Sequence, residues 1–260
     1  MGVFHQPDNF MIRLTNLSKK YGSLTAVDDL SLEVASGEIF GFLGPNGAGK
    51  TTTLKIMAGV LAPTSGEVEL GGFSVLREPS RAKALTGYIP DRPFLYDKLT
   101  GLEFLYFVGG LYGLLPKELE KEIETRLNLF DLWDWRHELI ESYSHGMKQR
   151  LIIVSALIHH PRVLIVDEPM VGLDPKGVRI VKRLFQKECA QGMTIFLSTH
   201  TLSTAQEICQ RIGIIQKGAL ITVGSMDSFS READWKAKGL ESLFLKLTGD
   251  IEEDFLDHLP

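Results

Sequence analysis

Two segments near the start of the chain show the pattern of strands with one buried face. Apolar and polar side chains alternate in residues 29–34 (DLSLEV), and residues 12–17 (IRLTNL) form a second candidate strand. Three later segments are nearly continuous apolar runs, which are typical of strands covered on both faces. These runs are 38–43 (EIFGFL), 162–169 (RVLIVDEP) and 194–200 (TIFLSTH).

Helical patterns lie between these strands. After the first buried run, apolar residues recur with helical spacing at Leu54, Met57, Ala58 and Leu61. Further along, Thr100 and Glu103 form a capping box, Pro116 opens a charged helix, and residues 146–161 form a third helix. The chain is therefore predicted to be helical over about 77–160.

The alternation of strands and helices predicts an α/β fold in which helices wrap a mostly parallel sheet. The early strands add an N-terminal antiparallel β part, and residues 213–224 (GIIQKGALITVG) are expected to form a hairpin. We expect a single domain over 1–260, with a core of about 12–76 and 161–224, a helical subdomain of about 77–160 and a C-terminal extension of about 225–260.

Composition narrows the range of functions. The chain has 260 residues, of which 44% are hydrophobic and 23% charged, and its formal net charge is −5. There is no large Lys/Arg cluster, so a nucleic-acid partner is not indicated. The opening residues lack the features of a secretion signal, and the longest apolar stretch, 151–158, is too short to span a bilayer. We expect a soluble, cytosolic chain.

Residues 44–51 (GPNGAGKT) follow the first buried run and fit the pattern G-x-x-x-x-G-K-[ST]. In such a loop, backbone N–H groups surround phosphate oxygens, Lys50 reaches the β- and γ-phosphates, and the Thr51 hydroxyl holds Mg²⁺. A Gly-rich turn without a ligand is the alternative, but the flanking strand and helix favour a P-loop NTPase. The expected nucleotide-binding residues are Gly44, Pro45, Asn46, Gly47, Ala48, Gly49, Lys50, Thr51 and Thr52.

Two carboxylates end the second buried run. Asp167 is expected to bind Mg²⁺ directly or through water, and Glu168 is placed to take a proton from an attacking water as general base. The alternative is a merely structural strand end, in which adjacent carboxylates would be costly unless capped or solvated.

The segment YSHGMKQR at 143–150 decides among P-loop enzymes. It resembles the signature of the ATP-binding subunits of ABC transporters, usually LSGGQ, which Ser144 and Gly146 match. The form of the segment is similar to that of a bacterial exporter-type subgroup, and the resemblance covers about residues 12–224. It implies that the Ser144 loop caps the γ-phosphate of an ATP held by a second ATP-binding subunit. An isolated helix start without a ligand would give the same string.

The resemblance assigns roles to other residues. Tyr21 is expected to stack on adenine, Asp174 to reach across the dimer, and His200 to contact the γ-phosphate and order the attacking water. Taken alone, each has a plainer interpretation as a packed Tyr, a common turn and a surface His. Lys50, Glu168 and His200 are the expected catalytic residues, and Thr51, Asp91 and Asp167 the expected metal ligands.

Two residues depart from the family pattern. Asp91 stands where the family usually has Gln, and we hypothesise that it keeps the role of sensing the nucleotide for the membrane partner. His145 replaces a glycine, and the imidazole would weaken closure, add pH sensitivity to hydrolysis, or simply point to solvent. No change in the pH profile of hydrolysis by the His145→Gly variant would contradict the pH-sensitive alternative.

The resemblance implies separate transmembrane permease subunits and a second ATP-binding subunit, an identical or related chain bound head to tail. Phe94, Leu95 and Tyr96 are candidates to contact the permease. The chain would then act at the cytoplasmic face of the membrane as a peripheral subunit. The signature and the C-terminal segment 241–249 favour export. A soluble ABC ATPase, such as one for Fe–S cluster assembly, is the alternative, and a small GTPase is excluded because no N-K-x-D motif is present.

Overall fold

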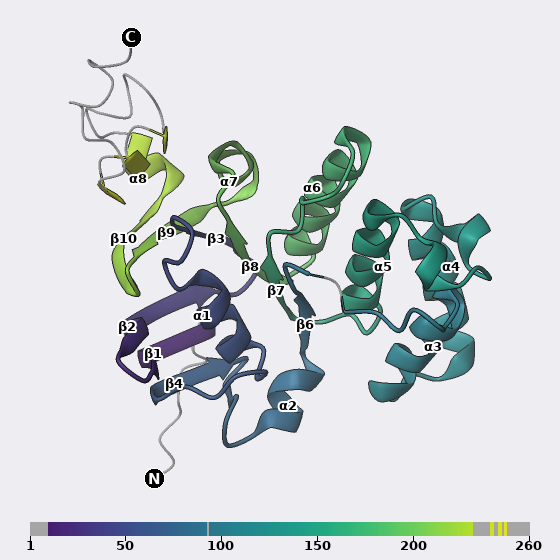
Figure 1. The fold of residues 1–260 in the computed structure, drawn as a ribbon, viewed down its shortest axis with the longest axis horizontal. Helices are drawn as coiled ribbons and strands as arrows, with labels where there is room; N and C mark the ends of the chain where they lie inside the picture. Colours follow the sequence, from purple (N-terminus) through teal and green to yellow (C-terminus); the bar gives the residue numbers. More distant parts are fainter. Residues whose placement is uncertain (1–9, 93, 231–239, 242–243, 246, 249–260) are drawn as a thin grey trace.

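The computed structural model describes residues 10–92, 94–230, 240–241, 244–245 and 247–248. Two sheets lie next to each other, and a group of helices lies at the far end of the larger sheet (Figure 1). The larger sheet carries the functional site, so the fold is described from there. Part of the exporter-like segment 241–249 lies outside the described residues.

The smaller sheet is four-stranded with the order β2-β1-β4-β5, and each of its pairs is antiparallel. It confirms the predicted N-terminal antiparallel part. Its outer face is solvated, as the alternating burial of the second strand shows. The strands are β1 (Phe10–Tyr21), β2 (Leu24–Ala35), β4 (Ser65–Leu70) and β5 (Phe73–Ser74).

The larger sheet is six-stranded with the order β10-β9-β3-β8-β7-β6. Its pairs are parallel except for the β9–β10 hairpin. Every residue of β3, β7 and β8 is buried, which confirms that the three apolar runs are covered on both faces. The strands are β3 (Ile39–Leu43), β6 (Thr86–Ile89), β7 (Val163–Asp167), β8 (Thr194–Thr199), β9 (Arg211–Gln216) and β10 (Ala219–Ser225).

The prediction that the chain is helical from about 77 to 160 is wrong at β6. This strand has four residues, too few to show a period, and it pairs with β7 in the core sheet. The short helix α2 (Pro79–Ala84) precedes it. Gly87 lies where a Cβ would overlap the carbonyl oxygen of Ala156, so a glycine lets the following helical layer pack directly onto the strand.

Three helices lie together at one end of the molecule (Figure 1): α3 (Gly101–Leu111), α4 (Pro116–Leu129) and α5 (His145–Leu157). The predicted capping box of Thr100 and Glu103 is present, and Pro116 is the first residue of α4. Four other helices flank the two sheets: α1 (Lys50–Met57), α6 (Pro175–Ala190), α7 (Leu202–Ile208) and α8 (Met226–Ser230). Within the described residues, no helix combines the length and the apolar character that crossing a bilayer requires.

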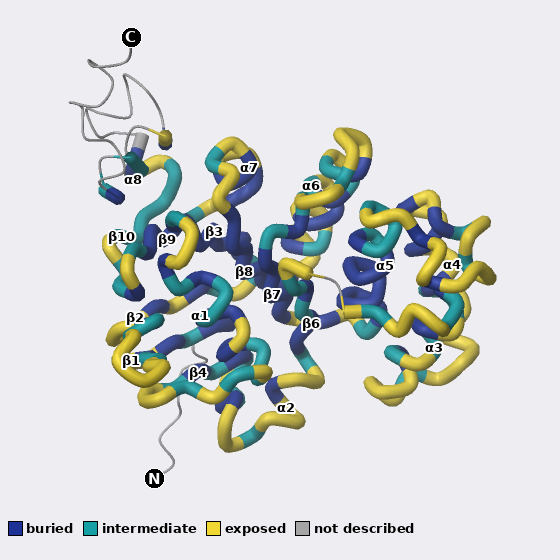
Figure 2. Tube along the Cα trace, viewed as in Figure 1, coloured by how far each residue is buried: buried dark blue, intermediate teal, exposed yellow. Residues whose placement is uncertain are grey.

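The strands β3, β7 and β8 are buried along their length (Figure 2). Buried side chains form two large clusters on the two faces of the core sheet. One cluster joins the sheet to α3, α4, α5 and α6, and the other joins it to α1 and the antiparallel sheet. Both faces of β3, β7 and β8 are therefore fixed, which holds the carboxyl ends of these strands in place. Those ends carry the predicted site residues.

Candidate functional site

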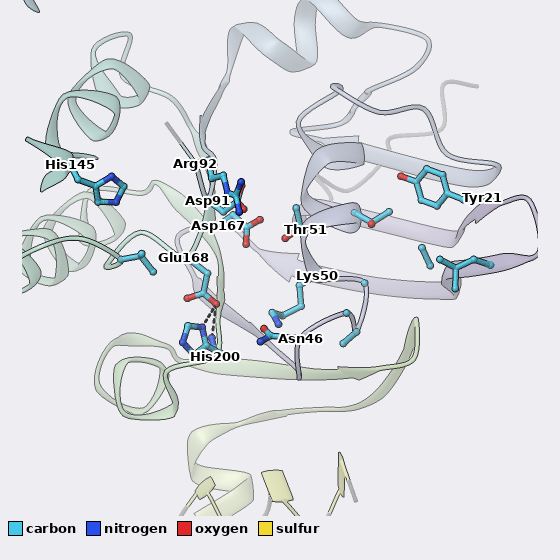
Figure 3. Close-up of a pocket in the computed structure, with 17 residues that line it drawn as sticks. Tyr21, Asn46, Lys50, Thr51, Asp91, Arg92, His145, Asp167, Glu168 and His200 are labelled. Carbon is cyan, nitrogen blue, oxygen red and sulfur yellow. Dashed lines mark hydrogen bonds and ion pairs between the residues drawn. The ribbon is translucent and has the colours of Figure 1, made fainter. Parts of the chain in front are cut away.

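The carboxyl ends of parallel strands meet at one edge of a sheet. At this edge β3 leads into the Gly44–Gly49 loop, β7 ends at Asp167 and β8 leads to His200. A cavity of about 610 Å³ opens there (Figure 3). It is lined by Tyr21, Leu24, Ala26, Asn46, Gly47, Ala48, Gly49, Lys50, Thr51, Thr52, Asp91, Arg92, His145, Asp167, Glu168, Val171 and His200.

The loop between β3 and α1 requires its glycines. Gly49 has a φ of 108° and Gly47 a φ of 78°, which favour residues without a Cβ. A Cβ at Gly44 would overlap the carbonyl oxygen of Ile215, and one at Gly49 would overlap that of Ala26. The loop therefore packs tightly against β9 and β2. It leads into the start of α1, whose free N–H groups and positive dipole favour an anion.

Lys50 is the first residue of α1, and its side chain folds back over the loop. Its Nζ donates to the carbonyl oxygens of Gly44 at 2.6 Å and Pro45 at 3.0 Å. Burial lowers the pKa of Lys50, while the charges of Glu168 and Asp167 act in the opposite direction. Gly44 and Pro45 do not line the cavity; they hold the lysine that does. The ammonium is thus fixed where a phosphate would lie.

Asp167 is buried with 1% of its surface exposed. Burial raises its pKa, the hydroxyls of Thr51 and Ser198 lower it, and the charges of Asp91 and Glu168 raise it again. Its Oδ2 atom is buried without a hydrogen-bond partner within the described part of the chain. Mg²⁺ is bound through one or two carboxylates, waters and substrate phosphates. The orphaned oxygen beside Thr51 fits that ion.

Glu168 follows directly, with a φ of 50° that turns its side chain into the cavity. Its Oε1 accepts hydrogen bonds from the backbone N–H of His200 at 2.8 Å and from His200 Nδ1 at 2.7 Å (Figure 3). Its Oε2 accepts a hydrogen bond from Thr199 Oγ1 at 3.1 Å. The sequence-predicted base and histidine are therefore in direct contact at the cavity wall.

Other predicted residues also line the cavity. Tyr21 is 48% exposed at the end of β1, with Lys19 Nζ 5.1 Å from the centre of its ring. Asp91 lies close to Asp167 and Thr51 (Figure 3). Arg92, next to Asp91, also lines the cavity, and sequence reasoning missed it. The sequence feature that could have indicated Arg92 is its position as a cation next to Asp91, a predicted metal ligand.

Ser144, Gly146 and Asp174 are not among the cavity-lining residues. Ser144 is the N-cap of α5, as predicted, and its Oγ accepts from Met147 N at 3.3 Å. Asp174 caps α6 by accepting from Gly177 N at 3.1 Å, and it also pairs with Arg150. Within one chain, these residues are separated from the phosphate loop.

His145 is exposed, but its ring is not free in solvent. It lines the cavity and packs on Gly172, at which a Cβ would overlap the imidazole. Gly172 also has a φ of 79°. This contact joins the signature segment to the loop that follows Glu168.

The Gly172→Ala variant is expected to lower the free energy of unfolding by at least about 1–2 kcal/mol, because an L-residue with positive φ carries a strain of that size and the new methyl group meets His145. In a His145→Gly background the new methyl group has no imidazole to meet, so Gly172→Ala should lower the free energy of unfolding by less. Urea denaturation of the four proteins of this cycle measures the difference. Equal costs in both backgrounds would contradict the contact.

The comparisons with known proteins agree with this geometry. Residues 27–171, more than half of the chain, match the family model described as ABC transporter. The chain belongs to the ABC transporter family. It is 38% identical to the linearmycin resistance ATP-binding protein LnrL of Bacillus subtilis over 83% of this chain and 69% of that protein. It is 39% identical to the bacitracin transport ATP-binding protein BcrA of Bacillus licheniformis over 81% of this chain and 68% of that protein.

Solved structures of ABC subunits have the same fold. An ATP-binding subunit of an ABC transporter superposes with a TM-score of 0.86 at 32% identity, covering 91% of this chain and 99% of that one. The ATP-binding cassette MJ0796, a dimer bound to ADP and phosphate after hydrolysis, superposes with a TM-score of 0.74 at 25% identity. The match covers 83% of this chain and 98% of that one. This ABC chain is thus an α/β P-loop NTPase that binds ATP with Mg²⁺ and hydrolyses it to power transport. Subunits of this family work as dimers with transmembrane subunits.

Proposed function

We propose that this chain powers export through separate transmembrane permease subunits, acting as a peripheral subunit at the cytoplasmic face of the membrane. The observation that carries the proposal is the Glu168–His200 pair at the wall of a cavity that also contains the phosphate loop. The pair supplies a carboxylate and an imidazole on the side of the cavity opposite Lys50 (Figure 3). Such a site suits hydrolysis rather than binding alone.

The residues have separate roles in hydrolysis. Backbone N–H groups of the Gly44–Gly49 loop and the Lys50 ammonium bind the phosphates, and Thr51, Asp167 and Asp91 hold Mg²⁺. The ion neutralises charge that develops on the phosphates when it is bound. Glu168 takes a proton from the attacking water, and His200 orients that water and the carboxylate. Positioning and charge stabilisation then account for most of the rate increase.

A second ATP-binding subunit, identical or related, completes the site in this proposal. The cavity of the chain itself is not lined by Ser144, Gly146 or Asp174. This supports a role for these residues toward a nucleotide held by the partner. The N-terminus of α5, capped by Ser144, presents a positive dipole to an approaching γ-phosphate. Tyr21 would stack on the adenine of the chain's own ATP.

An exposed aromatic patch supports contact with a permease. Its members are Phe94, Tyr96 and Phe107, which are 77%, 48% and 44% exposed. The rings of Phe94 and Phe107 both meet that of Tyr96 edge-on, with centroids 6.1 Å and 5.5 Å away. Leu95 is only half-buried and packs against the helical core. Aromatic surface of this kind marks partner sites, and two of its members, Phe94 and Tyr96, follow shortly after Asp91 in the chain.

The direction of transport is inferred from relatives. LnrL is named for resistance and BcrA for bacitracin transport, and a relative in Escherichia coli is named a probable multidrug transporter subunit. Resistance by an ATP-driven transporter requires that the compound leave the cell. A soluble assembly ATPase is not favoured, because the relatives are named as transporter subunits.

The Asp91→Ala variant is expected to reduce ATP-driven transport by about tenfold or more, the usual scale for the loss of a residue near a catalytic metal. Asp91 lies close to Asp167, and the aromatic residue Phe94 follows three positions later in the chain, so the loss of Asp91 should uncouple the nucleotide from the partner. Transport into inside-out vesicles measures the effect, with Asp134→Ala on the exposed helical surface as control. Unchanged transport would contradict the sensing role.

An affinity pull-down tests the proposed function. Glu168→Gln protein, which should bind ATP without cleaving it, is used as bait in detergent-solubilised native membranes with Mg-ATP, followed by mass spectrometry. We expect a protein with several transmembrane helices in stoichiometric amount. Recovery of soluble proteins alone, with the bait absent from membranes, would contradict the proposal.

A further inference from the structure

The cavity has an apolar end at Tyr21. Tyr21 pairs with Leu24 across the turn between β1 and β2, and both residues line the cavity. Lys50 and Thr51 lie between Tyr21 and Glu168 (Figure 3). A nucleotide whose phosphates lie at Lys50 would therefore extend its base toward Tyr21, away from the residues that act on water.

Lys19 contacts the Tyr21 ring and a second part of the chain at once. Its Nζ lies over the ring, 5.1 Å from the ring centre, and donates a hydrogen bond to the carbonyl oxygen of Ala62 at 2.8 Å. An ammonium over the face of an aromatic ring is attracted by the negative charge of that face. Ala62 lies in the connection between α1 and β4, so Lys19 joins the ring to the chain that leaves the phosphate-binding helix.

The connection that carries Ala62 is held against β1. The backbone N–H of Thr64 donates to the carbonyl oxygen of Ser18 at 2.8 Å. The backbone N–H of Lys20 donates to Thr64 Oγ1 at 2.9 Å. These bonds lie on both sides of Lys19 in the chain, so the Ala62 carbonyl is a fixed anchor for its ammonium.

The two faces of the Tyr21 ring have different surroundings. Tyr21 lines the cavity, whereas Lys19, whose ammonium lies over the ring, does not. The ammonium therefore covers the face that is turned away from the cavity and leaves the other face for a planar ligand. Because the Tyr21 side chain is 48% exposed, it would otherwise change rotamer readily.

We propose that Lys19 is a positioning residue for the nucleotide base. Its ammonium, anchored on the Ala62 carbonyl, holds the Tyr21 ring with one face toward the cavity. The cation also offsets part of the negative charge of the ring, which reduces the repulsion between the opposite face and the π electrons of the base. This contact acts on the base and leaves the phosphates unaffected. The inference rests on the proposed stacking of adenine on Tyr21.

Lys19→Met separates this role from a structural one, because it keeps the length of the side chain and removes the cation. The dissociation constant for Mg-ADP should rise about two- to fivefold, the scale of an exposed cation–π contact. The dissociation constant for Mg-pyrophosphate, which has no base, should keep the wild-type value. Lys19→Arg keeps a cation over the ring and should bind both ligands as the wild type does. Isothermal titration calorimetry measures both constants, and the readout does not depend on hydrolysis.

Lys20→Met is the matched control, because Lys20 is the exposed neighbour and its loss changes the net charge equally. It should leave both dissociation constants unchanged. Tyr21→Ala should raise that for Mg-ADP at least about fivefold, the scale of losing a stacked base. If Tyr21→Ala has this effect while Lys19→Met binds Mg-ADP as the wild type does, or weakens both ligands by the same factor, the inference alone is overturned. Unchanged Mg-ADP affinity in Tyr21→Ala would overturn the stacking role, and the inference with it.

Discussion

The Glu168→Gln variant is expected to lose ATP turnover by about 10²- to 10⁴-fold, the contribution of a positioned general base, while its affinity for ATP stays close to that of the wild type. The amide has the shape of the carboxylate, so its oxygen can still accept a hydrogen bond from His200 or Thr199. It cannot accept a proton from water. Steady-state phosphate release and binding of a fluorescent ATP analogue measure the two quantities.

Glu207→Gln is the control for this change. Glu207 is an exposed glutamate of α7 that pairs with Lys182, and surface pairs contribute at most about 1 kcal/mol. Its variant should turn over ATP at the wild-type rate. If Glu168→Gln also kept the wild-type rate, Glu168 would not be the general base, and a different group would have to activate the water.

Lys50→Ala is expected to reduce turnover by about 10²- to 10³-fold, the scale of removing one preorganised donor from developing charge. ATP binding should weaken as well, because in the proposed site the ammonium would contact the phosphates before and during the reaction. The loop itself is affected, since the carbonyl oxygens of Gly44 and Pro45 lose their donor. The ATP dependence of phosphate release gives both kcat and KM.

Lys55→Ala controls for the loss of a cation. Lys55 lies in the last turn of the same helix and is exposed. Its variant should keep wild-type values of kcat and KM. An equal loss in Lys50→Ala and Lys55→Ala would mean that the net charge of α1 matters, and that the contact with the loop does not.

The sequence was sufficient for the elements in which pattern and burial agree. β3, β7 and β8 are buried on both faces, so their apolar runs were plain, and Thr100, Pro116 and Ser144 start helices through local capping that their residue types specify. β6 was not predicted, because four residues are too few to show the alternation of apolar and polar side chains that marks a strand. Its place in the sheet is set by pairing with β7.

The candidate site divides in the same way. The phosphate loop, Asp167 and Glu168 follow strands directly, so their convergence at one sheet edge could be predicted from chain order. Arg92 was missed because its only local signal is a cation next to a predicted metal ligand, and it reaches the cavity through the position of β6 beside β7 in the core sheet. The contact of His145 with Gly172 joins residues 27 positions apart in different elements, and spacing alone does not predict it.

The central claim is that the Gly44–Thr51 loop holds ATP and that Glu168 is needed to cleave it. The most direct test is the identity of the nucleotide that remains bound after incubation with Mg-ATP and rapid desalting, measured by chromatography of the released nucleotide. The account predicts ADP on the wild-type protein and uncleaved ATP on Glu168→Gln. If the fraction of bound nucleotide that is ADP were the same on Glu168→Gln as on the wild-type protein, the claim that Glu168 is needed for cleavage would be contradicted.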